Sequence, residues 1–109
     1  MSERAFAGQT AIVTGASKGL GRAIALAFAA EGANVVLTGR TSAPLAGLAD
    51  EVRKLGGEPL VVPGDVAVTA DWAALVHTVL ARFPRIDVLV NNAGILGGAA
   101  ALCKIAEEE

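Results

Sequence analysis

Short apolar runs alternate with amphipathic segments along the whole chain. The apolar runs consist mostly of Val, Ile and Leu, and they predict four strands, at positions 10–13, 34–38, 59–62 and 86–90. Runs of this kind are typical of parallel strands that are buried on both faces of a sheet. We therefore expect helices on both sides of the sheet.

Apolar residues at helical spacing fill the three intervals between the predicted strands, over positions 20–28, 45–55 and 72–83. Ser42 and Thr69 are the N-cap candidates for the second and third helices, because a side-chain oxygen can accept a hydrogen bond from the first turn. Gly32 and the Gly56-Gly57 pair are suited to end the first and second helices.

This order of elements predicts an α/β fold with a doubly wound parallel sheet and about four strand–helix units. Right-handed crossovers would give the strand order 3-2-1-4, and a ligand would bind beyond the carboxyl ends of the strands, where the order reverses between the first strand and the fourth. No repeat, low-complexity tract or linker divides the sequence. We expect residues 1–109 to form a single domain.

The segment 14–21, Thr-Gly-Ala-Ser-Lys-Gly-Leu-Gly, joins the first strand to the first helix with the spacing TGxxxGxG. Gly15 permits a sharp turn, Gly19 leaves room for a phosphate to approach the backbone, and Gly21 lets the helix lie close to the sheet. The helix dipole attracts phosphate to the same place. An ordinary turn between a strand and a helix is the alternative, but both flanks favour a dinucleotide site.

The other polar motifs also follow predicted strands. Gly39-Arg40 follows the second, Gly64-Asp65-Val66 the third and Asn91-Asn92-Ala93-Gly94 the fourth. By itself, the segment around Asp65 is also ordinary turn chemistry. In this order, however, the glycine-rich segment, Asp65-Val66 and the Asn-Asn-Ala-Gly motif resemble the short-chain dehydrogenase/reductase (SDR) family, over the N-terminal half of its fold. The resemblance implies a Rossmann-like domain that binds a dinucleotide.

The resemblance also implies a role for most of these residues. Five residues of the glycine-rich segment would surround the pyrophosphate and the neighbouring ribose: Gly15, Ser17, Gly19, Leu20 and Gly21. Asp65 would accept a hydrogen bond from the adenine amino group, and Val66 would support the ring. Three residues of the last motif would border the adenosine ribose and brace the sheet: Asn91, Ala93 and Gly94.

The end of the second strand bears on the choice of cofactor. A carboxylate there would bind the ribose 2′-hydroxyl and repel a 2′-phosphate. This chain has Arg40 at that place and Lys18 in the glycine-rich segment, and the two cations could converge on a 2′-phosphate. They could also be ordinary solvated surface charges. The placement favours NADP(H) over NAD(H).

Composition excludes several classes of partner. The chain of 109 residues is 53% hydrophobic and 18% charged, and its net charge is −2 with both signs interspersed, so neither a nucleic acid nor a membrane surface is expected as a partner. The lone Cys103 cannot form an internal disulfide, and with one histidine, His77, no metal site is predicted. Trp72 is expected in the core and His77 on the surface. We expect a cytoplasmic protein.

The resemblance does not extend to the catalytic residues of the family. SDR enzymes transfer hydride between nicotinamide and a carbonyl or alcohol, with a Tyr as general acid/base, a Lys that lowers the pKa of that Tyr, and a Ser that orients the substrate. This chain contains no Tyr, and none of its Lys or Ser residues stands in a YxxxK motif or in the place of the family serine. We therefore assign no catalytic residue.

Three functional classes remain open. The first is the N-terminal cofactor-binding portion of an NADP(H)-dependent short-chain oxidoreductase, and it accounts most simply for a domain that looks truncated at its C-terminus. The second is a stand-alone nucleotide-binding module without catalysis. The third is a half-domain that a partner chain completes, since an unpaired edge of the fourth strand would invite self-association or another strand.

Overall fold

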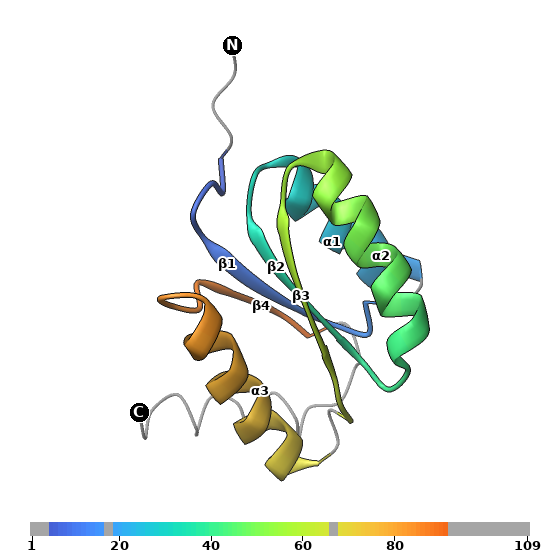
Figure 1. Cartoon of the computed structure of the whole chain (residues 1–109), viewed down its shortest axis with the longest axis vertical. Helices are drawn as coiled ribbons and strands as arrows, with labels where there is room; N and C mark the ends of the chain where they lie inside the picture. The colour runs from blue at the N-terminus through green and yellow to red at the C-terminus, as the bar shows by residue number, and fades with distance from the viewer. Residues whose placement is uncertain (1–4, 17–18, 66–67, 92–109) are drawn as a thin grey trace.

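The computed structural model describes residues 5–16, 19–65 and 68–91. The chain alternates regularly between strands and helices within these ranges (Figure 1). In order, the elements are β1 Thr10–Thr14, α1 Gly19–Ala30, β2 Asn34–Gly39, α2 Ser42–Leu55, β3 Glu58–Pro63, α3 Thr69–Arg82 and β4 Val88–Val90. The four strands and three helices are those that the hydrophobic pattern predicts.

The strands form one parallel sheet with the order β3-β2-β1-β4, which confirms the predicted topology. β1 is buried along its whole length, and β2 is buried except at its two terminal residues. β4 is shorter than the predicted strand and begins at Val88. Just before it, the Asp87 amide donates to Thr10 O at 2.9 Å, while the Asp87 carboxylate accepts the Thr10 amide proton at 2.8 Å. The Asp87 side chain thus extends the hydrogen bonding between β1 and β4 at the start of β4.

Helices cover both faces of the sheet, as the uniformly apolar strands predict. α1 and α2 lie together on one face and α3 on the other (Figure 1). Side chains alternate between the two cores along each strand. In β1, Val13 packs in the core under α1 and α2, whereas Ile12 packs against α3. Trp72 is 1% exposed in the second core, and His77 is exposed, so both predictions for these residues are confirmed.

The helix starts differ from the prediction by one residue. Ser42 and Thr69 are the first helical residues, and the N-cap positions belong to Thr41 and Val68, neither of which caps its helix through a side-chain hydrogen bond. Val68 O accepts the amide protons of Asp71 and Trp72, so backbone geometry sets the start of α3. The predicted end of α2 is confirmed, because Gly56 has φ +100° and donates to Arg53 O, while Gly57 donates to Val52 O.

Gly57 also provides a stability prediction, because it lies against the backbone of neighbouring segments. A Cβ added there would come within 2.9 Å of Ala29 Cα and 3.0 Å of Ala33 O. We expect Gly57→Ala to lower the free energy of unfolding by about 1–3 kcal/mol, as overpacking does. Urea denaturation followed by circular dichroism measures the change.

Gly47→Ala is the matched control for this substitution. Gly47 lies inside α2, and a Cβ added there would meet no atom within 4 Å in the described part of the chain, beyond its chain neighbours and the backbone of α2 itself. Alanine has the higher helix propensity, so this variant should gain roughly 0.5–1 kcal/mol. Equal stabilisation by both substitutions would contradict the close contacts described for Gly57.

Candidate functional site

The glycine-rich segment leads from β1 into α1 through two glycines with left-handed backbone angles. Gly15, directly after β1, has φ +60°, and Gly19, the first residue of α1, has φ +61°. Both angles lie in the region that favours glycine, so the prediction of a sharp turn at Gly15 fits the structure. Apart from its two chain neighbours and the backbone of its own helix, no atom of the described residues lies within 4 Å of a Cβ added to Gly19. The start of α1 is therefore open to a ligand that approaches the backbone.

The first turn of α1 contains no acidic side chain that would repel an anionic ligand. The structure describes that turn completely, and no Asp or Glu lies in it. Gly21 is buried, which fits a close approach of the helix to the sheet, and Leu20 is 67% exposed beside it. Ala16 is anchored by a hydrogen bond from its amide to Thr38 O at 3.3 Å. Two residues assigned to the site, Ser17 and Lys18, lie outside the described residues.

Arg40 and Asp65 meet at the carboxyl ends of β2 and β3. The two strands are neighbours, and their register brings Gly39 opposite Pro63. Beyond this pair, the Gly64 amide donates to Gly39 O at 2.9 Å. Arg40 Nε then lies 3.8 Å from Asp65 Oδ1, with the arginine side chain 74% exposed. An ion pair this long and this exposed is weak, so it leaves the guanidinium able to take another anionic partner.

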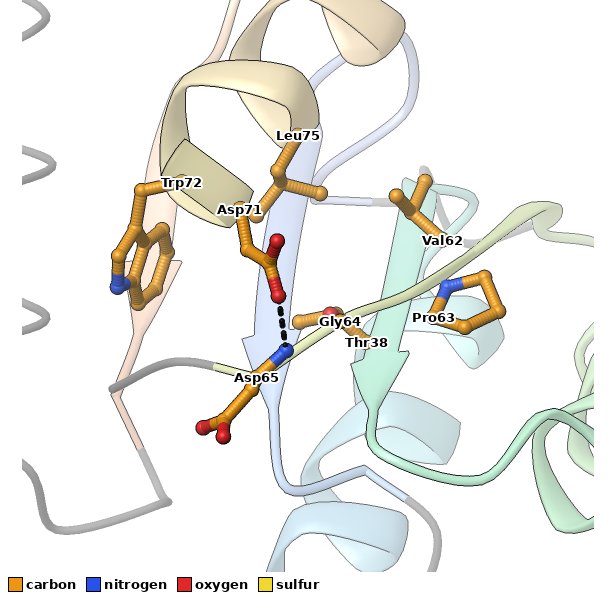
Figure 2. A pocket seen from close by; sticks show the side chains of 8 residues that line it. All are labelled: Thr38, Val62, Pro63, Gly64, Asp65, Asp71, Trp72 and Leu75. Carbon is orange, nitrogen blue, oxygen red and sulfur yellow. Dashed lines mark hydrogen bonds between the residues drawn. The ribbon is translucent and has the colours of Figure 1, made fainter. Parts of the chain in front are cut away.

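Asp65 is held from behind by the start of α3. Its amide donates to Asp71 Oδ2 at 2.8 Å, and its carbonyl accepts the Val68 amide proton at 2.9 Å. In Figure 2 the amide of Asp65 faces Asp71, whereas its carboxylate points away from α3. A hollow of about 10 Å³ adjoins this contact. Its volume suits roughly one water molecule, so a nucleotide base would lie outside it, on the carboxylate side of Asp65.

The sequence did not single out Asp71 as part of this site. Asp71 lies in the first turn of α3, where an acidic side chain interacts favourably with the helix dipole. An acid at the third position of a helix often reaches back to the amide of the N-cap residue. Here that amide, of Val68, donates to Asp65 O, and Asp71 reaches further back to Asp65. The spacing could suggest a backward contact, but only the structure shows its partner.

The end of β4 lies against the end of β1. Thr14 is fully buried, and its Oγ1 is 3.3 Å both from Val90 O and from Asn91 Oδ1. These contacts hold Asn91 beside the glycine-rich segment, at the point where the strand order reverses. Three further residues assigned to the site lie outside the described residues: Val66, Ala93 and Gly94.

The described residues thus place four features along one edge of the sheet. In the order of the strands, these are Asp65 after β3, Arg40 after β2, the two left-handed glycines after β1 and Asn91 after β4. Within the same ranges, no group of three His, Cys, Asp or Glu side chains could hold a metal ion. None of the helices there has the length and apolar character needed to cross a bilayer. Cys103 lies outside these ranges.

The edge described above can offer different groups to a ligand at each strand. α1 supplies backbone N–H groups and a positive dipole end, which suit phosphate oxygens. Arg40 supplies an exposed, planar cation, and Asp65 supplies a carboxylate that accepts hydrogen bonds. Taken together, these groups are complementary to a nucleotide with more than one phosphate.

Comparison with known proteins agrees with this arrangement. The family model described as short chain dehydrogenase matches residues 9–109. A 3-oxoacyl-[acyl-carrier-protein] reductase from Synechocystis sp. is 47% identical over 92 residues, which cover 84% of this chain and 37% of the relative. The chain therefore spans little more than a third of the length of that relative.

Solved structures show the same fold. L-sorbose reductase from Gluconobacter frateurii, in complex with NADPH and L-sorbose, superposes with a TM-score of 0.87 and 32% identity over 94% of this chain and 48% of its own. A metagenomic short-chain oxidoreductase in complex with NADP gives a TM-score of 0.86 and 34% identity over 92% of this chain and 55% of its own. With the family-model match, these likenesses establish that the chain belongs to the short-chain dehydrogenase family.

Proposed function

We propose that the chain binds NADP(H) as the cofactor-binding part of a short-chain oxidoreductase, which transfers hydride between the nicotinamide and a carbonyl or alcohol. The observation that carries this proposal is the glycine-rich segment, with Gly15 and Gly19 in the left-handed region and an open first turn of α1. A pyrophosphate fits there because it meets backbone N–H groups and no Cβ. When bound, the cofactor supplies the hydride or accepts it.

The residues of the edge have distinct parts in this proposal. Gly15, Gly19 and Gly21 shape the pyrophosphate site, and Asp65 accepts a hydrogen bond from the adenine amino group. Five further residues complete the site around the phosphates, the adenine and the adenosine ribose: Ser17, Leu20, Val66, Ala93 and Gly94. Asn91 borders the ribose, and its contact with Thr14 keeps β4 aligned with β1.

Arg40 and Lys18 select the phosphorylated cofactor. β2 ends at Gly39 and Arg40 follows it, so the chain has a cation directly after β2 and not the carboxylate that would bind a 2′-hydroxyl and repel a 2′-phosphate. Arg40 is largely exposed and only weakly paired with Asp65. Its guanidinium can therefore form charge-assisted hydrogen bonds with the phosphate. The NADPH and NADP bound by the two structural relatives support the same choice.

The hydride-transfer step is assigned to no residue of this sequence, because the chain contains no Tyr. It spans between 37% and 55% of the three relatives described above. The proposal therefore divides the reaction: this chain binds and orients the cofactor, and the remaining length of an SDR protein supplies the acid/base group and the substrate pocket.

Titration of the purified chain with NADPH and NADH tests the binding proposal. Nicotinamide fluorescence and thermal unfolding are followed together. We expect saturable NADPH binding that raises the free energy of unfolding by about 2.7 kcal/mol at a cofactor concentration 100 times the Kd. NADH should need a higher concentration for the same effect. If neither cofactor binds, the proposal is wrong for this chain.

A further inference from the structure

Asp71, near the start of α3, makes none of the proposed cofactor contacts. It does contact Asp65, which is proposed to bind the adenine. Asp71 Oδ2 accepts the Asp65 amide proton at 2.8 Å, and Asp65 O accepts the Val68 amide proton at 2.9 Å (Figure 2). Both peptide groups that flank the Asp65 Cα are therefore bonded to the first residues of α3 or to its N-cap. This fixes the direction of the Cα–Cβ bond.

The direction matters because the Asp65 side chain faces away from α3. Its carboxylate lies on the Arg40 side, with Oδ1 3.8 Å from Arg40 Nε. A turn of the peptide between Gly64 and Asp65 would move this carboxylate along the sheet edge. Gly64 is held on its other side by its amide, which donates to Gly39 O at 2.9 Å. Asp71 therefore completes a set of three hydrogen bonds that hold the backbone of Gly64 and Asp65.

We propose that Asp71 is a positioning residue for the adenosine end of the dinucleotide site, acting through the Asp65 amide. The inference rests on the proposed function, since Asp65 must contact the adenine for its position to matter. Asp71 itself does not reach the cofactor, because it sits behind the Asp65 backbone beside a hollow of about 10 Å³.

Two substitutions separate this role from simple stabilisation of α3. Asp71→Asn keeps an oxygen that can accept the amide proton but loses the negative charge, whereas Asp71→Ala loses both. Both variants should lose the same favourable interaction with the helix dipole. Only Asp71→Ala should weaken NADPH binding, by about fivefold to tenfold, the size expected for the loss of one ordinary hydrogen bond.

A double-substitution cycle tests whether Asp71 acts through Asp65. If it does, Asp71→Ala should have little further effect on NADPH affinity in a chain that already carries Asp65→Ala. Asp50→Ala, which removes an exposed carboxylate on α2, is the control for a general change in charge and should leave the affinity within about twofold. Equal losses of affinity in Asp71→Asn and Asp71→Ala, or additive losses in the cycle, would overturn the proposal.

Amide hydrogen exchange at Asp65 gives a readout that needs no cofactor. The Asp65 amide should be protected in the wild-type chain and in Asp71→Asn, and should exchange about tenfold faster or more in Asp71→Ala. Exchange that is equally fast in all three chains contradicts the positioning role whether or not NADPH binds. Protection without any NADPH binding would instead contradict the proposed function and leave Asp71 with no adenosine to position, which also overturns the inference.

Discussion

Gly19→Val should abolish the binding of both NADPH and NADH. Gly19 opens α1 with φ +61°, and a Cβ added there would meet no atom of the described residues within 4 Å, other than its chain neighbours and the backbone of its own helix. In the proposed complex the space around that Cβ belongs to the pyrophosphate. A branched side chain would keep the phosphates away from the N–H groups of the first turn. Titration of the variant should show no saturation at cofactor concentrations about 100 times the wild-type Kd, as expected when several charge-assisted bonds are lost together.

Two further variants separate this effect from a loss of stability. Gly8→Val is the matched control, because Gly8 also has a positive φ, +81°, and a Cβ added there would likewise meet no atom within 4 Å among the described residues other than its chain neighbours. It precedes the amino end of β1, whereas the site lies at the carboxyl ends. Each Val substitution should cost about 1–2 kcal/mol for the left-handed backbone, but Gly8→Val should bind NADPH normally.

Gly19→Asn is the second variant, because asparagine tolerates the left-handed region better than valine does. It should therefore keep more of the stability and still bind poorly, since it places a side chain where the phosphates would lie. If Gly8→Val and Gly19→Val weaken binding equally, the loss reflects strain in the fold and the phosphate site is wrongly placed.

The topology could be predicted from the sequence because it depends on residue types that have few alternatives. Continuous Val, Ile and Leu runs fix the buried strands, and right-handed crossovers leave one simple order for them. The same reasoning places Gly15, Arg40, Asp65 and Asn91 at one edge, since parallel strands end on the same side. The structure confirms that placement for these four residues.

Details that depend on backbone geometry could not be predicted in this way. Ser42 and Thr69 have side chains suited to an N-cap, yet each helix starts one residue earlier than those caps require. The bond between Asp65 and Asp71 spans the turn into α3, while the Val68 amide, which an acid at this position often reaches, donates to Asp65 O. Residue type alone does not reveal which of two backbone amides an acid will reach.

Arg40→Asp should reverse the preference between the two cofactors. The substitution removes the cation that would contact the 2′-phosphate and puts a carboxylate in its place, where it would repel that phosphate and accept a hydrogen bond from a free 2′-hydroxyl. We expect NADPH binding to weaken about 100-fold or more, and NADH binding to stay within about threefold of the wild type or to improve. Parallel fluorescence titrations with the two cofactors measure the ratio of their Kd values.

Arg53→Asp is the matched control for net charge. Arg53 is an exposed arginine in the last turn of α2, paired with Asp50 at 2.9 Å, and its substitution changes the net charge by the same amount. Because exposed charges farther apart than about 10 Å are largely screened at 0.1 M salt, this variant should affect both cofactors alike and only slightly. A local role for Arg40 therefore requires a change in the ratio of Kd values that Arg53→Asp does not reproduce. Equal weakening of NADPH and NADH by Arg40→Asp would show instead that Arg40 serves the part common to both cofactors, through its contact with Asp65, and that the NADP(H) preference lies elsewhere.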